Sequence, residues 1–163
     1  MKLSPGVILR RVRRDLVYHA VGTFVLAAAI YLHTRDSGCV ALVVLGGILI
    51  DVDHFIDYAL VFKSKFHLRK FLLSDYLKSG KIYIILHSWE LIILLGAVSL
   101  LTDSYGLFLL SLSMAMHLGI DSIQRMNPLL YFLVVRILRR FDASVLVPEY
   151  GDEYYAERTK HAV

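Results

Sequence analysis

Cysteine is almost absent from this chain, and charged residues are few. Cys39 is the sole cysteine, so no disulfide can form within the chain and the fold does not depend on an oxidising compartment. Charged residues make up 20% of the 163 positions, whereas 57% are hydrophobic and the mean hydropathy is +0.60. A soluble domain is usually about 45–50% apolar. The composition therefore indicates one small membrane-embedded domain.

Four segments are long and apolar enough to cross a bilayer as helices, which takes about 20 residues. They cover residues 16–32, 40–62, 82–101 and 105–123. Apolar residues at helical spacing beside basic ones also predict two helices lying on the membrane surface, over residues 66–77 and 128–141, with Asn127 capping the second. We therefore predict an all-α, polytopic membrane helical bundle. Residues 1–147 form a single integral-membrane domain in this prediction, and residues 148–163 form a polar cytoplasmic tail.

The basic residues are distributed very unevenly between the two ends of these predicted spans. Of the 18 lysine and arginine residues, all but Arg35 lie before the first span, between the second and third, or after the fourth. Lysine and arginine accumulate on the cytoplasmic side of a membrane. The pattern predicts a multi-pass protein of the inner (cytoplasmic) membrane with both termini cytoplasmic. The first span is longer than a typical signal-peptide core, so we expect a retained anchor.

Ionisable side chains interrupt the second span, which reads Leu-Ile-Asp-Val-Asp-His-Phe-Ile-Asp-Tyr over residues 49–58. Asp51, Asp53, His54 and Asp57 all lie in this stretch. A carboxylate in hydrocarbon costs several kcal/mol unless it is paired, hydrated, protonated or bound to a metal. The cluster therefore predicts a functional site in the second span.

The other three spans place ionisable groups at a similar depth. His19 lies near the start of the first, His87 near the start of the third, and His117 and Asp121 near the end of the fourth. At about 1.5 Å of helix rise per residue, the whole set lies within roughly 14 Å of the cytoplasmic face. The four predicted helices thus deliver ionisable side chains to one level of the membrane.

Helical spacing also brings several of these groups onto shared faces. Asp53, His54 and Asp57 fall on one face of their helix, and His117 and Asp121 are one turn apart. A helical bundle can turn such faces inward and hold a metal between them. Imidazole and carboxylate together suit zinc, manganese or iron better than magnesium or calcium. A divalent metal is the expected cofactor, although a purely structural polar network remains an alternative.

Taken in order, these motifs resemble those of the YdjM-like membrane-bound metal-dependent hydrolases. That family has an early His, a Pro-Asp-x-Asp-His segment, a His-Arg-Gly-x-Thr-His-Ser segment and a late His-x-x-x-Asp, all on short apolar helices. The matching residues are His19, Asp51-Val52-Asp53-His54, His87-Ser88 and His117-Leu118-Gly119-Ile120-Asp121. The resemblance covers residues 16–123. This chain departs from the pattern at Ile50, where the family has proline, and at Ile82, Tyr83 and Ile84, where it has His-Arg-Gly.

The resemblance implies metal-assisted hydrolysis. The implied metal ligands, for one or two ions, are Asp53, His54, His87, His117 and Asp121. Zinc is the first choice of metal, with manganese or iron as alternatives. Asp51, Asp57 and His19 would complete the metal shell or act as general base. His67, in the basic loop, is a candidate replacement for the histidine missing at Ile82.

The implied partners are membrane lipids, and the implied substrate is a lipid or phosphoester that reaches the site from the cytoplasmic leaflet. Arg125 and the basic loop would attract its anionic headgroup, and no nucleic-acid partner is expected. Two other functions stay open: a non-catalytic or degenerate metal-binding membrane protein, because Ile82 removes a potential ligand, and an ion or proton transporter. Transport is disfavoured because residues 23–32 and 91–101 carry no ionisable group besides Tyr31. The sequence leaves the oligomeric state open.

Overall fold

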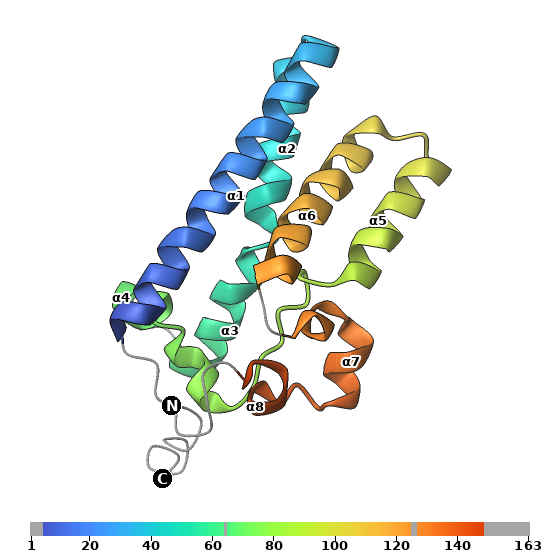
Figure 1. Cartoon of the computed structure of the whole chain (residues 1–163). Helices are drawn as coiled ribbons and strands as arrows, with labels where there is room; N and C mark the ends of the chain where they lie inside the picture. The colour runs from blue at the N-terminus through green and yellow to red at the C-terminus, as the bar shows by residue number, and fades with distance from the viewer. Residues whose placement is uncertain (1–4, 64, 125–126, 149–163) are drawn as a thin grey trace.

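Two antiparallel helical hairpins form the body of the protein (Figure 1). A computed structural model describes residues 5–63, 65–124 and 127–148, and over these residues it contains helices and no β-strand. Helices α1 (Pro5–Thr34) and α2 (Ser37–Leu49) make the first hairpin, and α5 (Trp89–Leu101) and α6 (Tyr105–Gln124) make the second. Helix α6 packs against α1, α2 and α5, so it lies at the centre of the bundle. The predicted all-α bundle is confirmed.

Three helical stretches are long and apolar enough to cross a membrane, namely Gly6–Thr34, Ser37–Phe62 and Tyr105–Gln124. Helix α5 is equally apolar but has only 13 residues. Large apolar side chains such as Phe24, Leu100 and Ile123 point outward, as a lipid-facing surface requires. The described chain is therefore a membrane-type bundle with three candidate spans and one shorter apolar helix.

The prediction of a full third span over residues 82–101 is wrong for residues 82–88. Helix α5 begins at Trp89, and residues 82–88 run as a non-helical segment on its N-terminal side. The apolar composition of this segment matches a helix, but its backbone bonds to side chains of other elements instead. His87 consequently lies in the segment that precedes a helix and not within one.

A break also divides the second predicted span. Helix α2 ends at Leu49 and helix α3 (Val52–Phe62) follows in a different direction (Figure 1). Between them the N–H of Asp51 bonds to the carbonyl of Ile48, three residues back instead of four, at 3.1 Å. Asp51 thus lies at the break, while Asp53 and Asp57 lie on the buried face of α3.

Short helices cover one end of the bundle, at the bottom of Figure 1. These are α4 (Leu68–Leu72), η1 (Asp75–Ser79), η2 (Pro128–Tyr131), α7 (Leu133–Leu138) and α8 (Ala143–Leu146). Each of the two predicted surface helices is therefore broken into short pieces. The predicted cap is confirmed, since the Asn127 side chain accepts the N–H of Leu129 at 3.2 Å. Arg125 and residues 149–163 of the predicted tail lie outside the described residues.

The broken pieces pack onto the bundle, because their apolar side chains enter its main core. Tyr76, Leu77, Leu130 and Leu146 are all nearly fully buried there, together with Ile50 at the helix break. The short helices therefore form a cover over the end of the bundle that carries the ionisable groups.

Small residues allow α2 and α6 to approach closely beside the helix break. A Cβ added to Gly46 would lie 2.9 Å from Cβ of Ser113 and 3.0 Å from the carbonyl oxygen of Leu110. The Ser113 hydroxyl donates a buried hydrogen bond to the Val43 carbonyl. Close contacts of small residues with interhelical hydrogen bonds are the usual basis of helix packing in membranes.

The substitution Gly46→Ala is expected to lower the thermal unfolding temperature of the protein in detergent, because forcing a methyl group into a packed contact costs about 1–3 kcal/mol. Gly119→Ala is the matched control within α6, since an added Cβ there meets nothing within 4 Å. Its gain in helix propensity, up to about 1 kcal/mol, should hold or raise the unfolding temperature. Size-exclusion chromatography after heating would measure both variants. An unchanged unfolding temperature for Gly46→Ala would contradict the close packing.

Candidate metal centre

Two carboxylates of α3 explain why residues 82–88 are not helical. Asp53 Oδ2 accepts the backbone N–H groups of residues 86 and 87 at 2.7 and 3.2 Å. Asp57 Oδ2 accepts those of residues 83 and 84 at 2.9 and 3.4 Å. Buried backbone groups in a membrane protein must find their partners within the protein. Asp53 and Asp57 supply these partners, which fixes the segment that carries His87.

Four potential ligand atoms from three different parts of the chain converge beside this segment. Asp51 Oδ1 lies 3.4 Å from His117 Nε2 and 3.6 Å from His87 Nε2. Asp121 Oδ2 lies 3.7 Å from His117 Nε2 and 3.5 Å from His87 Nε2. Ligand atoms around one tetrahedral zinc ion are about 3.3–3.6 Å apart, given bond lengths of about 2.0–2.2 Å. These four carboxylate–imidazole distances are therefore close to those expected around a single divalent ion.

One of these atoms also lacks any other partner. His87 is 1% exposed, and its Nε2 atom is buried with no hydrogen bond. A buried polar atom without a partner is costly and calls for an explanation. A metal ion among Asp51, His87, His117 and Asp121 would supply the missing partner and would balance the two carboxylates. The donor set and its geometry thus fit a metal.

Hydrogen bonds to the opposite ring nitrogens orient the two histidines. His87 Nδ1 lies 2.9 Å from Asp53 Oδ1, and His117 Nδ1 lies 3.0 Å from the carbonyl oxygen of Gly47. With the proton on Nδ1 in each ring, both bonds are satisfied and both Nε2 atoms present lone pairs to the centre. Carboxylate and carbonyl partners of this kind orient histidine ligands in metal sites.

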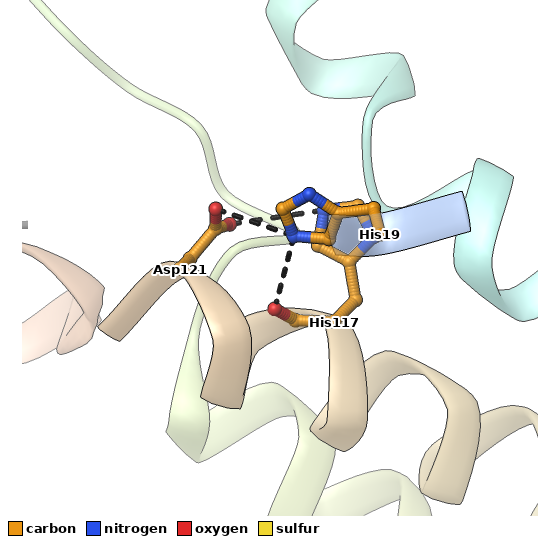
Figure 2. Close-up of side chains that lie close together, drawn as sticks. All are labelled: His19, His117 and Asp121. Atoms are coloured by element: carbon orange, nitrogen blue, oxygen red, sulfur yellow. Dashed lines mark hydrogen bonds and ion pairs between the residues drawn. The ribbon is translucent and has the colours of Figure 1, made fainter. Parts of the chain in front are cut away.

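His19 reaches the same centre from α1 (Figure 2). Its ring stacks on that of His117 with 3.8 Å between centroids, and its Nε2 lies 3.4 Å from Asp121 Oδ1. Its Nδ1 lies 2.9 Å from the backbone oxygen of Asp15. His19, His117 and Asp121 form a second group with ligand atoms within 4.8 Å of one another. His19 therefore either orients Asp121 or contributes to a second ion.

A cavity of about 40 Å³ opens beside the centre, and His54 lines it together with Asp51, His87 and Asp121. The Nδ1 atom of His54 lies 3.2 Å from the hydroxyl of Tyr76, and its Nε2 lies 3.9 Å from Asp51 Oδ1. A polar cavity of this size holds one or more water molecules. His54 thus lies between the candidate ligands and the space available to water.

The structure brings most of the predicted site residues together, but their hydrogen-bond partners differ. His54, His87, His117 and Asp121, predicted as ligands, all belong to groups able to hold a metal, as does Asp53 with His54 and His87. Both oxygens of Asp53, however, already accept hydrogen bonds from residues 86 and 87. Asp51 contributes an oxygen atom to the centre, beside His87 and His117. It was predicted, together with His19 and Asp57, as a catalytic or shell residue.

Asp57 and His67 lie apart from this centre. Asp57 belongs to none of the metal-binding groups found among the described residues, and it anchors the backbone of the 82–88 segment. Its predicted catalytic role stays a prediction. His67 is exposed and its backbone N–H bonds to the Tyr58 hydroxyl, while Ile82, where the resembled family has histidine, is 4% exposed in the apolar core. His67 is not in any metal-binding group of the described chain and does not replace the missing ligand.

Three contributors were not identified from the sequence. Asp15 lines the cavity and is four residues before His19, a helical spacing that provided a usable signal. Tyr76 reaches His54 from η1, and its position within a basic loop gave no such signal. Arg136 lies fully buried against the 82–88 segment, although its sequence context resembled the basic end of a surface helix.

Comparisons with family models, with curated proteins and with solved structures found no match to this chain. The class of protein therefore follows from the structure itself. The chain is an all-helical, membrane-type bundle in which buried histidine and aspartate groups at one end can hold a metal ion.

Substitution of a central ligand should abolish metal binding. We expect the protein, purified in detergent without chelator and supplied with zinc, to retain zinc in stoichiometric amount by elemental analysis. Asp51→Ala and His117→Ala should retain little, because each removes one of four ligands. His33→Ala is the matched control, since His33 is exposed at the far end of α1. Zinc retention by both central variants at the wild-type level would rule out this centre.

Proposed function

We propose that this protein is a membrane-embedded, metal-dependent hydrolase that acts on a lipid or phosphoester near the cytoplasmic face of the inner membrane. The proposal is carried by one observation: Asp51 and Asp121 each place a carboxylate oxygen 3.4–3.7 Å from the Nε2 atoms of His87 and His117, and Nε2 of His87 is buried with no hydrogen-bond partner. The resemblance to the YdjM-like hydrolases supports the same reaction class.

Asp51, His87, His117 and Asp121 would hold the ion. A set of two imidazoles and two carboxylates favours zinc, with manganese and iron as alternatives. A bound ion of this kind supplies Lewis acidity, which makes water nucleophilic near neutral pH and polarises the bond to be cleaved. Asp53 and the carbonyl of Gly47 hold the rings of His87 and His117 in the required orientation.

His54 is the best placed residue to move a proton. It lines the cavity, whereas His19 does not, and Asp57 is engaged with backbone N–H groups. Its Nδ1 lies 3.2 Å from the Tyr76 hydroxyl and its Nε2 lies 3.9 Å from Asp51 Oδ1, on the side of the candidate ligands. In this proposal Nε2 accepts a proton from water or delivers one to a leaving group. In this proposal Asp51 binds metal, and His54 takes the acid–base role considered for Asp51, Asp57 and His19.

The charge distribution supports a cytoplasmic site. The start of α1, with Arg10, Arg11, Arg13 and Arg14, lies at the same end of the bundle as α4 and α7 (Figure 1). The candidate centre lies near this end too, because α3 and the 82–88 segment belong to this end of the bundle. By the positive-inside rule this end faces the cytoplasm, and both termini are cytoplasmic. The basic surface would attract an anionic headgroup from the inner leaflet.

Transport is the weaker alternative, because the opposite half of the bundle contains an apolar core. Ala27, Val43 and Leu109 are buried together there, and Val43 and Leu109 are 0% exposed. An ion pathway would need polar groups through this region. A non-catalytic metal-binding protein is the second candidate, favoured by the burial of Ile82 in the apolar core.

Turnover should separate the hydrolase from the non-catalytic candidate. We expect the zinc-loaded protein to cleave at least one member of a panel of fluorescent glycerophospholipids and aryl phosphoesters. His54→Gln should keep its zinc but lose about 10²–10⁴-fold in kcat, the usual range for a general acid–base residue. His33→Gln should keep both properties. Full zinc occupancy with no turnover on any substrate would reject catalysis and favour the non-catalytic reading.

A further inference from the structure

We infer that Arg136, on the short helix α7, is a positioning residue for the metal centre. Its guanidinium holds three carbonyl groups of the 82–88 segment and thereby fixes His87. This inference rests on the proposed metal centre. Arg136 belongs to a part of the chain that the family resemblance does not cover, and it reaches none of the ligand atoms itself.

The guanidinium bonds to backbone oxygens along the segment. Arg136 Nη1 donates to the carbonyls of Tyr83, at 2.7 Å, and of Ile84. Its Nη2 donates to the carbonyl of His87, at 3.2 Å, and to the hydroxyl of Ser88. The side chain is 0% exposed. Asp53 and Asp57 accept the N–H groups of the 82–88 segment, and Arg136 donates to carbonyl groups of the same segment.

No carboxylate makes a direct ion pair with Arg136 among the described residues, so its charge is compensated at a distance. Burial lowers the pKa of the guanidinium, and the nearby charges of Asp53, Glu90 and Asp57 oppose this effect. A buried charge is weak evidence for stability, and a specific structural role better accounts for its presence. The rigid planar fork of arginine can hold several carbonyls at once, which the single ammonium of lysine cannot.

The conformation of the segment shows why it needs to be held. Ile84 has a φ of +32°, which is a genuine outlier for a β-branched residue. Strained residues of this kind persist where the surroundings over-determine them, and they cluster at functional sites. Both flanking peptide groups of Ile84 bond to Arg136 or Asp57. Without the guanidinium, the carbonyls of Tyr83, Ile84 and His87 would lose the bonds that tie them to α7.

Helix α7 is itself anchored to the core of the site. Both carboxylate oxygens of Glu90 accept N–H groups at its start, from Leu133 at 2.9 Å and Val134 at 3.1 Å. Glu90 lies three residues after His87, so the helix that carries Arg136 is tied to the same stretch of chain that Arg136 restrains. This reciprocal arrangement places Arg136 where a small displacement would be transmitted to the His87 ring.

The test compares Arg136→Met and Arg136→Lys with Arg139→Met, which alters an exposed arginine at the end of the same helix. Zinc affinity would be measured in detergent by competition with a chelator of known affinity. Hydrogen–deuterium exchange of the metal-free proteins would report the backbone of residues 82–88. We expect about 10–100-fold weaker zinc binding for the Arg136 variants, as for loss of other groups that orient metal ligands. Exchange should accelerate in residues 82–88, and Arg139→Met should match the wild type.

A folded Arg136→Met protein with wild-type zinc affinity would overturn the inference alone. If that variant does not fold, Arg136→Lys decides, because it keeps the charge but not the fork, and unchanged affinity there would overturn it equally. Failure of the wild type to bind zinc would overturn both this inference and the proposed function. Weaker zinc binding with accelerated exchange confined to residues 82–88 supports the positioning role, since general destabilisation would also accelerate exchange within α5.

Discussion

The rest of the structure depends on how one irregular piece of backbone is satisfied in an apolar bundle. Residues 82–88 form no helix, so their N–H and C=O groups require partners from elsewhere in the chain. Asp53 and Asp57 of α3 accept the N–H groups, and Arg136 of α7 donates to the carbonyls. This set of bonds ties three distant parts of the sequence together. The candidate metal centre exists because His87 is carried by the restrained segment.

The two carboxylates of α3 mainly bind backbone groups. The free-energy cost of placing a carboxylate in an apolar span does not by itself suggest this role. An aspartate within an apolar span is expected to bind a metal or a proton, yet Asp57 binds backbone and Asp53 binds backbone and one histidine ring. Asp51, at the break between α2 and α3, is the member of the cluster that meets both His87 and His117. One carboxylate faces the centre, and two organise the protein around it.

The sequence predicted the helical class, the shared depth of the ionisable groups and most of the residues that meet there. It succeeded for His117 and Asp121 because one helical turn separates them. It succeeded for His19 because the basic residues identified the cytoplasmic end of each span, and His19 lies near that end of the first span. It failed for residues 82–88, since hydropathy measures composition and cannot detect that distant carboxylates replace helical hydrogen bonds. The resemblance implied Asp53 as a ligand and Asp51 as a shell or acid–base residue; the structure groups Asp53 with His54 and His87, and Asp51 with His87 and His117. Arg136 gave no signal, because a buried arginine that binds carbonyls has the same local sequence as a surface one.

The position of α7 in the chain also bears on the order in which the protein is made. Every candidate ligand, from His19 to Asp121, leaves the ribosome before Arg136 does, so the segment that carries His87 lacks its carbonyl restraints until translation has passed α7. Up to that moment Asp53 and Asp57 can hold the N–H groups of the segment and the His87 ring, but Arg136 cannot yet hold its carbonyls. A protein built this way can complete its binding site only after all its membrane-type helices have been synthesised.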